Sequence, residues 1–205
     1  MRIEHDMTGP LSVNTYLVID EETKKAFLVD PGGWSKRLAK SIESGAASLE
    51  YIILTHSHGD HIGGEEDFLE AFPDTKLVCA RAEKELIEDL DKSFASQFGI
   101  DEPLKPDVYV EDGDTLAVGA MTVTMIHTPG HTPGGLCILA GDCLFSGDTL
   151  FAQSIGRTDF PGGSFAALKK AVHEKLFTLP DDTKVYPGHM GETTIGFEKR
   201  HNPFV

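Results

Sequence analysis

The chain has 205 residues, 40% hydrophobic and 25% charged, which suits a globular protein that buries its core without disulfides. Its 18 basic and 33 acidic residues give a net charge of −15, which argues against nucleic acid as a partner. No run approaches the ~20 apolar residues of a membrane-spanning helix, and no apolar secretory core follows the N-terminus. We therefore expect a cytoplasmic protein that has no membrane partner.

The first half of the chain alternates between strands and helices. Its expected strands are 12–20, 25–30, 49–55 and 76–80. Its expected helices are 35–44, 65–72 and 82–90. The segment 91–107 has no regular period, so we interpret it as a loop beside a site or as a simple connection.

The second half is richer in strands and ends with a helix and a strand. Its expected strands are 108–110, 115–118, 121–127, 136–139, 143–146 and 183–186. Apolar residues recur at helical spacing over 164–179, which predicts an amphipathic helix. This order fits a mixed α/β fold of two sheets packed face to face with helices outside, in one domain over 1–205.

The three cysteines, Cys79, Cys137 and Cys143, form no C-x-x-C pair. Each lies in or beside an apolar run, where a free cysteine behaves as a small buried hydrophobe. They therefore give no sign of an oxidising compartment.

Residues 55–61 carry the densest group of reactive side chains, in the run Thr-His-Ser-His-Gly-Asp-His. His56 and His58 lie two apart on an extended chain, so their side chains point to one side and can share an ion. The glycine that follows lets the backbone turn, so Asp60 and His61 face a different point. Four ligands exceed the three of a catalytic zinc, which favours two divalent ions. Zinc is the first expectation, with iron or manganese as alternatives.

Three further candidate ligands come later, each beside Gly or Pro where an apolar run stops. They are His131, Asp148 and His189. Such a turn exposes a side chain on a rigid stem. The remaining histidines lack this setting, and we interpret them as structural or surface residues: His5, His127, His173 and His201.

The H-x-H-x-D-H run, followed by His, Asp and His at strand ends, resembles the metallo-β-lactamase superfamily. The resemblance extends from Asn14-Thr15-Tyr16 and Val29-Asp30-Pro31-Gly32 to His189. It implies an αβ/βα four-layer sandwich with the metals at one edge of the inner sheets.

The resemblance also implies a role for each candidate ligand. The first metal would be held by His56, His58 and His131. The second would be held by Asp60, His61 and His189. Asp148 would bridge both ions. Asp30 is expected near the site, with a turn-forming role before Pro-Gly as the alternative.

A hydroxide between two ions about 3.5–4 Å apart is a nucleophile at neutral pH, so no serine or cysteine nucleophile is needed. The same ions can stabilise an oxyanion, and Asp60 would orient the hydroxide. We expect hydrolysis of a thioester, ester or lactone. The β-lactamases of this family commonly place a cysteine where Asp148 stands, so the carboxylate looks instead like the glyoxalase II, lactonase and phosphodiesterase branches.

The run Gly156-Arg157-Thr158-Asp159-Phe160 and the ending at 202–204 resemble short glyoxalase II-like proteins, which are hydroxyacylglutathione hydrolases. The implied substrate is a small acyl-thiol such as S-lactoylglutathione. The chain ends soon after His189, without the helical domain that supplies glutathione contacts in longer relatives, so the thiol carrier stays open. Arg157 is expected either to contact a substrate carboxylate or to fix its loop through an ion pair.

Persulfide dioxygenases share the same runs and provide the main alternative. They bind a single iron, which here would be held by His56, His131 and Asp148. That branch usually has alanine before the last histidine, so Gly188 favours the hydrolase. A metal-bearing binding domain without turnover is a third interpretation.

Overall fold

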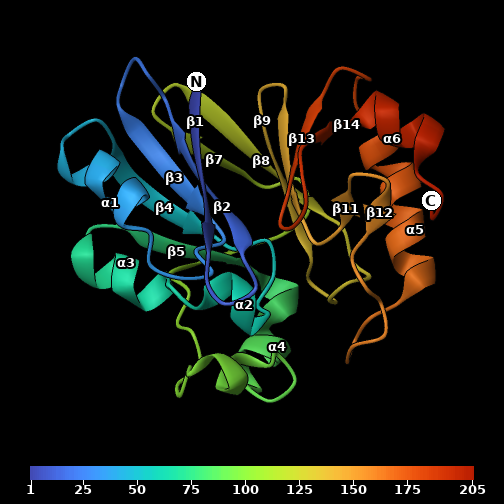
Figure 1. The fold of residues 1–205 in the computed structure, drawn as a ribbon, viewed down its shortest axis with the longest axis horizontal. Coiled ribbons are helices and arrows are strands. Elements are labelled where there is room, and N and C mark those ends of the chain that lie inside the picture. Colours follow the sequence, from blue (N-terminus) through green and yellow to red (C-terminus); the bar gives the residue numbers. More distant parts are fainter.

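The computed structural model describes residues 1–205 and consists mainly of two six-stranded sheets packed face to face (Figure 1). The first sheet contains, in spatial order, β1 (Arg2–Thr8), β2 (Val13–Ile19), β3 (Lys25–Val29), β4 (Ser48–Ile53), β5 (Lys76–Ala80) and β6 (Val108–Val110). The second contains β14 (Thr193–Thr194), β13 (Lys184–Pro187), β10 (Cys143–Gly147), β9 (Leu136–Ala140), β8 (Met121–His127) and β7 (Thr115–Val118). A small pair is formed by β11 (Leu150–Phe151) and β12 (Ser154–Ile155).

Helices cover the outer side of each sheet, and two short ones lie along one edge, below the sheets in this view (Figure 1). Those of the first half are α1 (Lys36–Glu43), α2 (Gly59–Ile62), α3 (Glu65–Ala71) and α4 (Lys84–Glu88). Those of the second half are α5 (Phe165–Glu174) and α6 (Ile195–His201). Ser35 and Ser164 cap α1 and α5, since each hydroxyl accepts from a backbone N–H three residues on. No helix is both long enough and apolar enough to cross a lipid bilayer.

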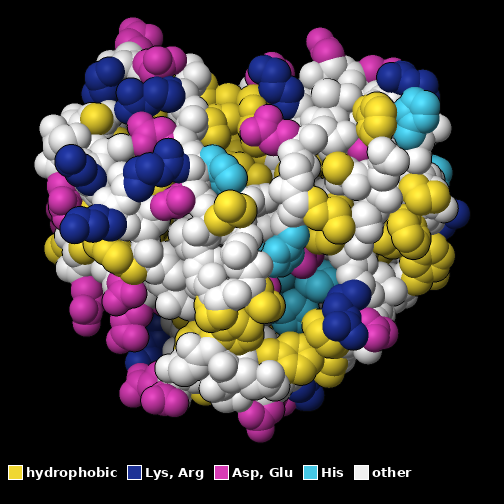
Figure 2. Space-filling view, in the orientation of Figure 1, with side chains coloured by type: hydrophobic (Ala, Val, Ile, Leu, Met, Phe, Trp, Pro, Cys, Tyr) yellow, Lys and Arg dark blue, Asp and Glu magenta, His cyan; other side chains and the backbone are white.

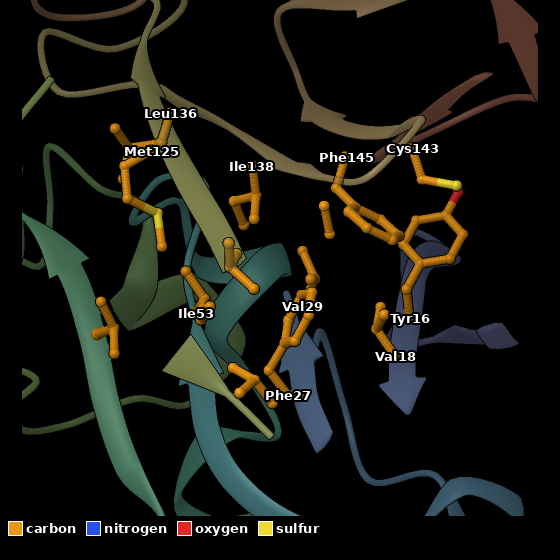
Figure 3. Close-up of a cluster of buried hydrophobic side chains, with 14 of the residues drawn as sticks. Tyr16, Val18, Phe27, Val29, Ile53, Met125, Leu136, Ile138, Cys143 and Phe145 are labelled. Carbon is orange, nitrogen blue, oxygen red and sulfur yellow. The ribbon is translucent and has the colours of Figure 1, made fainter. Parts of the chain in front are cut away.

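Three apolar clusters hold together the four layers of the molecule, which are two layers of helices and the two sheets between them. Between the sheets lie alternate residues of facing strands, including Val18 and Phe27 from the first sheet and Ile138 and Phe145 from the second (Figure 3). The intervening residues of the same strands point outward and pack under the helices. Because β2 is covered on both faces, all seven of its residues are buried. The expected αβ/βα four-layer sandwich is confirmed.

Strand direction brings several chain turns to one edge. In the first sheet, β3, β4 and β5 pair in parallel, so their carboxyl ends lie together. In the second sheet, β9 is antiparallel to both β8 and β10, and β13 is parallel to β10. The carboxyl ends of β8, β10 and β13 therefore also share an edge, and the candidate ligands follow these ends.

Two predicted helices need correction, and the first strand and the last helix were not predicted. The strand β1 was not predicted, because an edge strand with mixed exposure has no clear apolar pattern. The helix α6 was also missed. The predicted helix 164–179 ends at Glu174, where Lys175 forms the C-cap with φ of −119°, and a 3-10 turn follows at Leu176–Thr178. The predicted helix 82–90 is instead a 3-10 turn, Arg81–Glu83, followed by the short α4.

The irregular segment 91–107 contains a short 3-10 turn, Ala95–Phe98, and lies beside the candidate site. The ring centroid of Phe94 is 5.8 Å from that of His58. The three cysteines are free and buried, as expected, and burial raises the pKa of Cys137 to about 11.

The buried carboxyl of Glu65 in α3 makes the stability of the fold depend on pH. Glu65 is 7% exposed, and its burial, with Glu66 and Asp107 nearby, raises its pKa from 4.5 to about 7. The folded protein therefore holds this proton more tightly than the unfolded chain, and stability is lost as pH rises from about 4.5 to 7. We expect Glu65→Gln to raise the free energy of unfolding by about 2–3 kcal/mol at pH 8.

Urea unfolding of both proteins at pH 4, 6 and 8 measures this difference. It should shrink to nearly zero at pH 4, where the carboxyl is protonated in both states. Glu70→Gln, at an exposed position on the same helix that does not contribute to the raised pKa of Glu65, should show little change at any of these pH values. An equal gain from Glu65→Gln at pH 4 and pH 8 would contradict the assignment.

Candidate metal centre

Imidazole and carboxylate side chains from both halves of the chain meet where the strand ends converge. Figure 2 shows histidines in a hollow between the two halves, with hydrophobic side chains around it. Three groups at this site have ligand atoms that all lie within 4.8 Å of one another. The first consists of His56, His58 and His131. The second consists of Asp60, His61 and His189. The third consists of Asp30, His56 and His61.

The three histidines of the first group present ring nitrogens to a common point. Nδ1 of His58 lies 2.9 Å from Nε2 of His131. The other nitrogen of His131, Nδ1, donates to the backbone carbonyl of Arg157 at 2.7 Å. That bond leaves the Nε2 lone pair of His131 available, as metal-binding histidines require.

The second group is arranged in the same way. Nδ1 of His61 donates to Oδ2 of Asp30 at 2.9 Å, which leaves its Nε2 lone pair available. This Nε2 lies 3.7 Å from Oδ2 of Asp60. The same Asp60 oxygen lies 3.3 Å from Nε2 of His189.

Asp148 lies between the two groups. Its Oδ1 is 3.4 Å from Nε2 of His61, and its Oδ2 is 3.7 Å from Nε2 of His131. Its Oδ2 is also 3.8 Å from Nε2 of His189. All seven expected ligands are thus brought together, and Asp148 has the position that a bridging carboxylate needs.

Several buried polar atoms of this cluster have no hydrogen-bond partner in the protein. They are Nε2 of His56, His58 and His61, and Oδ1 of Asp148. Leaving such an atom unpaired costs about 1–3 kcal/mol. Divalent cations are suited to imidazole and carboxylate ligands, so bound metal ions would satisfy Nε2 of His56 and His61 and Oδ1 of Asp148. His58 presents its other nitrogen, Nδ1, to the first group.

The protonation states also suit a cation. Burial and the neighbouring imidazoles lower the pKa of His56 far below its usual value and that of His58 to about 3, so both rings are neutral, as metal ligands must be. Burial alone would raise the pKa of Asp148, but His61 and the other nearby histidines hold it below the usual range. His61 is the exception: burial opposes its protonation, yet the carboxylates of Asp148 and Asp30 raise its pKa, so a bound cation would have to displace the proton from its Nε2.

Asp30 combines both roles considered for it. Its backbone lies in the left-handed region with φ of +46°, a strained turn conformation for a residue with a Cβ. Its buried carboxylate accepts from the backbone N–H of Thr55 at 2.7 Å, from the hydroxyl of Thr55 at 2.6 Å and from His61. These bonds use both oxygens, so Asp30 orients His61 and joins the ends of β3 and β4.

Arg157 forms the loop-fixing ion pair, one of the two roles expected. Its guanidinium donates twice to Asp159, at 2.8 Å each, and lies 3.7 Å from the ring centroid of Phe160. Phe160 packs against Phe94 at 4.5 Å, and its ring centroid lies 5.5 Å from that of His58. This aromatic pair flanks the first group and was not identified as part of the site. Contact between Arg157 and a substrate carboxylate stays a prediction.

The other four histidines lie outside the cluster. His5 bonds to Asn14 and stacks on Tyr16, while His127 bonds to the carbonyl of Pro133. The last two are exposed on helices: His173 on α5 and His201 on α6.

Known proteins resemble the chain over nearly its whole length. Hydroxyacylglutathione hydrolase GloC from Haemophilus influenzae is 36% identical over 210 residues, covering 100% of this chain and 98% of that protein. The solved structure of BLEG-1 B3 metallo-beta-lactamase has a TM-score of 0.89 and 35% identity, covering 99% of both chains.

Two further solved structures are similar. TTHA1623 in a di-iron-bound form has a TM-score of 0.84 and 34% identity, covering 98% of this chain and 100% of that one. ETHE1 from Myxococcus xanthus has a TM-score of 0.79 and 31% identity, covering 99% of this chain and 84% of that one. The family model described as "Metallo-beta-lactamase superfamily" matches residues 8–189, a span that includes all seven expected ligands. The chain therefore belongs to the metallo-beta-lactamase superfamily.

Proposed function

We propose that this metal-dependent hydrolase binds two metal ions and cleaves a small thioester such as S-lactoylglutathione. The observation that carries the proposal is the pair of His/Asp groups joined by Asp148, with buried ligand atoms that lack any partner in the chain. The similarity to the hydroxyacylglutathione hydrolase GloC supports the substrate class. Zinc is the first expectation for the metal, and similarity to a di-iron-bound structure supports iron as the alternative.

Two bound divalent ions would polarise the thioester carbonyl and supply an activated water. Asp60 is the residue placed to orient that water. Its side chain is 14% exposed at the mouth of the site, and its Oδ2 lies between the Nε2 atoms of His61 and His189. Interaction with His189, and the charge of His61, keep the pKa of Asp60 low despite burial, so the carboxylate is ready to accept a hydrogen bond. The rings of Phe94 and Phe160 would contact the substrate and exclude water beside the first ion.

A glycine next to the last ligand supports two ions rather than one. A Cβ at Gly188 would lie 2.5 Å from Oδ1 of Asp148 and 2.7 Å from Cε1 of His61. Both distances are far below van der Waals contact, so any larger residue would displace these two side chains. The missing Cβ therefore gives the second group its compact geometry. This favours the dinuclear hydrolase over a single-iron dioxygenase, to which the ETHE1 structure would otherwise point.

We expect Gly188→Ala to lower the metal content of the purified protein from about two ions per chain to about one, because it displaces ligands of the second ion. Elemental analysis by mass spectrometry measures this directly. Gly191→Ala is the matched control in the same loop, since a Cβ there meets nothing within 4 Å, and it should keep both ions. If Gly188→Ala still holds two ions, this glycine does not determine the number of metals.

Turnover of S-lactoylglutathione should stop after chelation and return when Zn²⁺ is added.

Asp60→Asn should lower kcat/KM by about 10²–10⁴-fold, because a neutral amide can neither accept the water proton nor balance the metal charge. Asp74→Asn, at an exposed position away from the site, should change it by less than about 2-fold.

Oxygen consumption with glutathione persulfide is the decisive comparison for this proposal. If the iron-loaded protein consumes oxygen with that substrate and does not cleave the thioester, the proposed hydrolysis is wrong and the dioxygenase alternative holds.

A further inference from the structure

Besides Asp30, a second carboxylate outside the expected ligand set is fully buried near the metal centre. It is Glu83, and it takes no part in the mechanism above. It lies at the end of the 3-10 turn Arg81–Glu83, and its exposed fraction is 0%. Its Oε2 accepts from the backbone N–H of Ser57 at 2.9 Å and from the Ser57 hydroxyl at 2.6 Å. Its Oε1 accepts from the backbone N–H of Gly134 at 2.7 Å. Both oxygens are acceptors, as an ionised carboxylate requires.

The two partners of Glu83 belong to the two segments that carry the first group of ligands. Ser57 stands between His56 and His58, and Gly134 comes three residues after His131. The segments are far apart in the sequence, and no side-chain bond of Asp30 reaches the segment of His131. At Gly134 the packing is so close that a Cβ would lie 2.5 Å from the backbone N of Glu83.

We propose that Glu83 is a positioning residue that fixes the separation of these two segments and thereby the affinity of the first metal ion. Its two oxygens form charge-assisted bonds to the backbone N–H groups of Ser57 and Gly134, so one carboxylate holds both segments. The distance between the segments in turn sets the point at which the histidine rings of the first group converge. Asp30 does the corresponding work for the second group through His61. The inference rests on the metal centre of the proposed function but not on the thioester chemistry.

Glu83→Gln tests the proposal with little change in volume. Each carboxylate oxygen accepts from a backbone N–H, so the glutamine amide must point its NH₂ at a donor in either orientation. Zn²⁺ affinity is measured by competition with a chromophoric chelator in two backgrounds: His189→Ala, which weakens the second site, and His58→Ala, which weakens the first. We expect a loss of about 10–100-fold in the first background and less than about 3-fold in the second.

Glu198→Ala is the control for a general loss of stability. Glu198 is also 0% exposed and accepts from Gln153, Thr193 and Asn202, away from the first group. This variant should lower Tm without lowering Zn²⁺ affinity in the His189→Ala background. If Glu83→Gln does not fold, Ser57→Ala, which removes only the hydroxyl donor, should still weaken the first site by about 3–10-fold.

Equal losses at both sites, or no loss at the first, would overturn the positioning role of Glu83. The Zn²⁺ readout keeps this outcome separate from the proposed reaction. A protein that binds two Zn²⁺ ions but leaves S-lactoylglutathione intact would reject the thioesterase and leave the role of Glu83 standing.

Discussion

The burial of imidazole and carboxylate groups at one edge of two sheets is the constraint on which the site depends. Water is largely excluded there, so each ring nitrogen or carboxylate oxygen needs a partner or an ion. The chain provides a hydrogen-bond partner for only one ring nitrogen of His61, through Asp30. The atoms without partners include Nε2 of His56 and Oδ1 of Asp148. Divalent cations bind imidazole nitrogens and carboxylate oxygens, so ions at this site would satisfy these atoms.

Two buried carboxylates outside the ligand set divide the work of holding this edge together. Asp30 joins the ends of β3 and β4 and orients His61. Glu83 lies in the turn after β5 and bonds to loops from both sheets. In each case a negative charge lies near the candidate ligands, where it would compensate the positive charge of bound ions. Asp30 also orients the ring of His61. The sheets form a rigid framework, and these carboxylates determine how the ligand-bearing loops are placed relative to it.

The sequence allowed most strands and the ligand cluster to be predicted because both leave local signals, whereas the four-layer sandwich was predicted from the resemblance to the superfamily. Period-two apolar runs marked the inner strands, and H-x-H-x-D-H marked the first half of the metal centre. The long-range parts left none. Glu83 is one acidic residue among many in a segment that reads as an ordinary helix, and the contact between Phe94 and Phe160 joins two irregular segments. The edge strand β1 has mixed exposure, so its pairing with β2 is apparent only in the sheet.

The surroundings of the site bear on which thiol carrier the proposed reaction would use. The net charge of −15 repels an anionic substrate at long range, but salt screens that repulsion beyond about 8 Å. Close to the first group, Arg157 is engaged with Asp159 in an exposed ion pair, which solvent screens and which therefore contributes little to stability. A substrate carboxylate that reached this loop could therefore exchange with Asp159 at small cost, while Phe160 keeps the guanidinium in place. Selection for a charged carrier would then depend on this single exchange, whereas the aromatic pair contributes apolar contact for any acyl group.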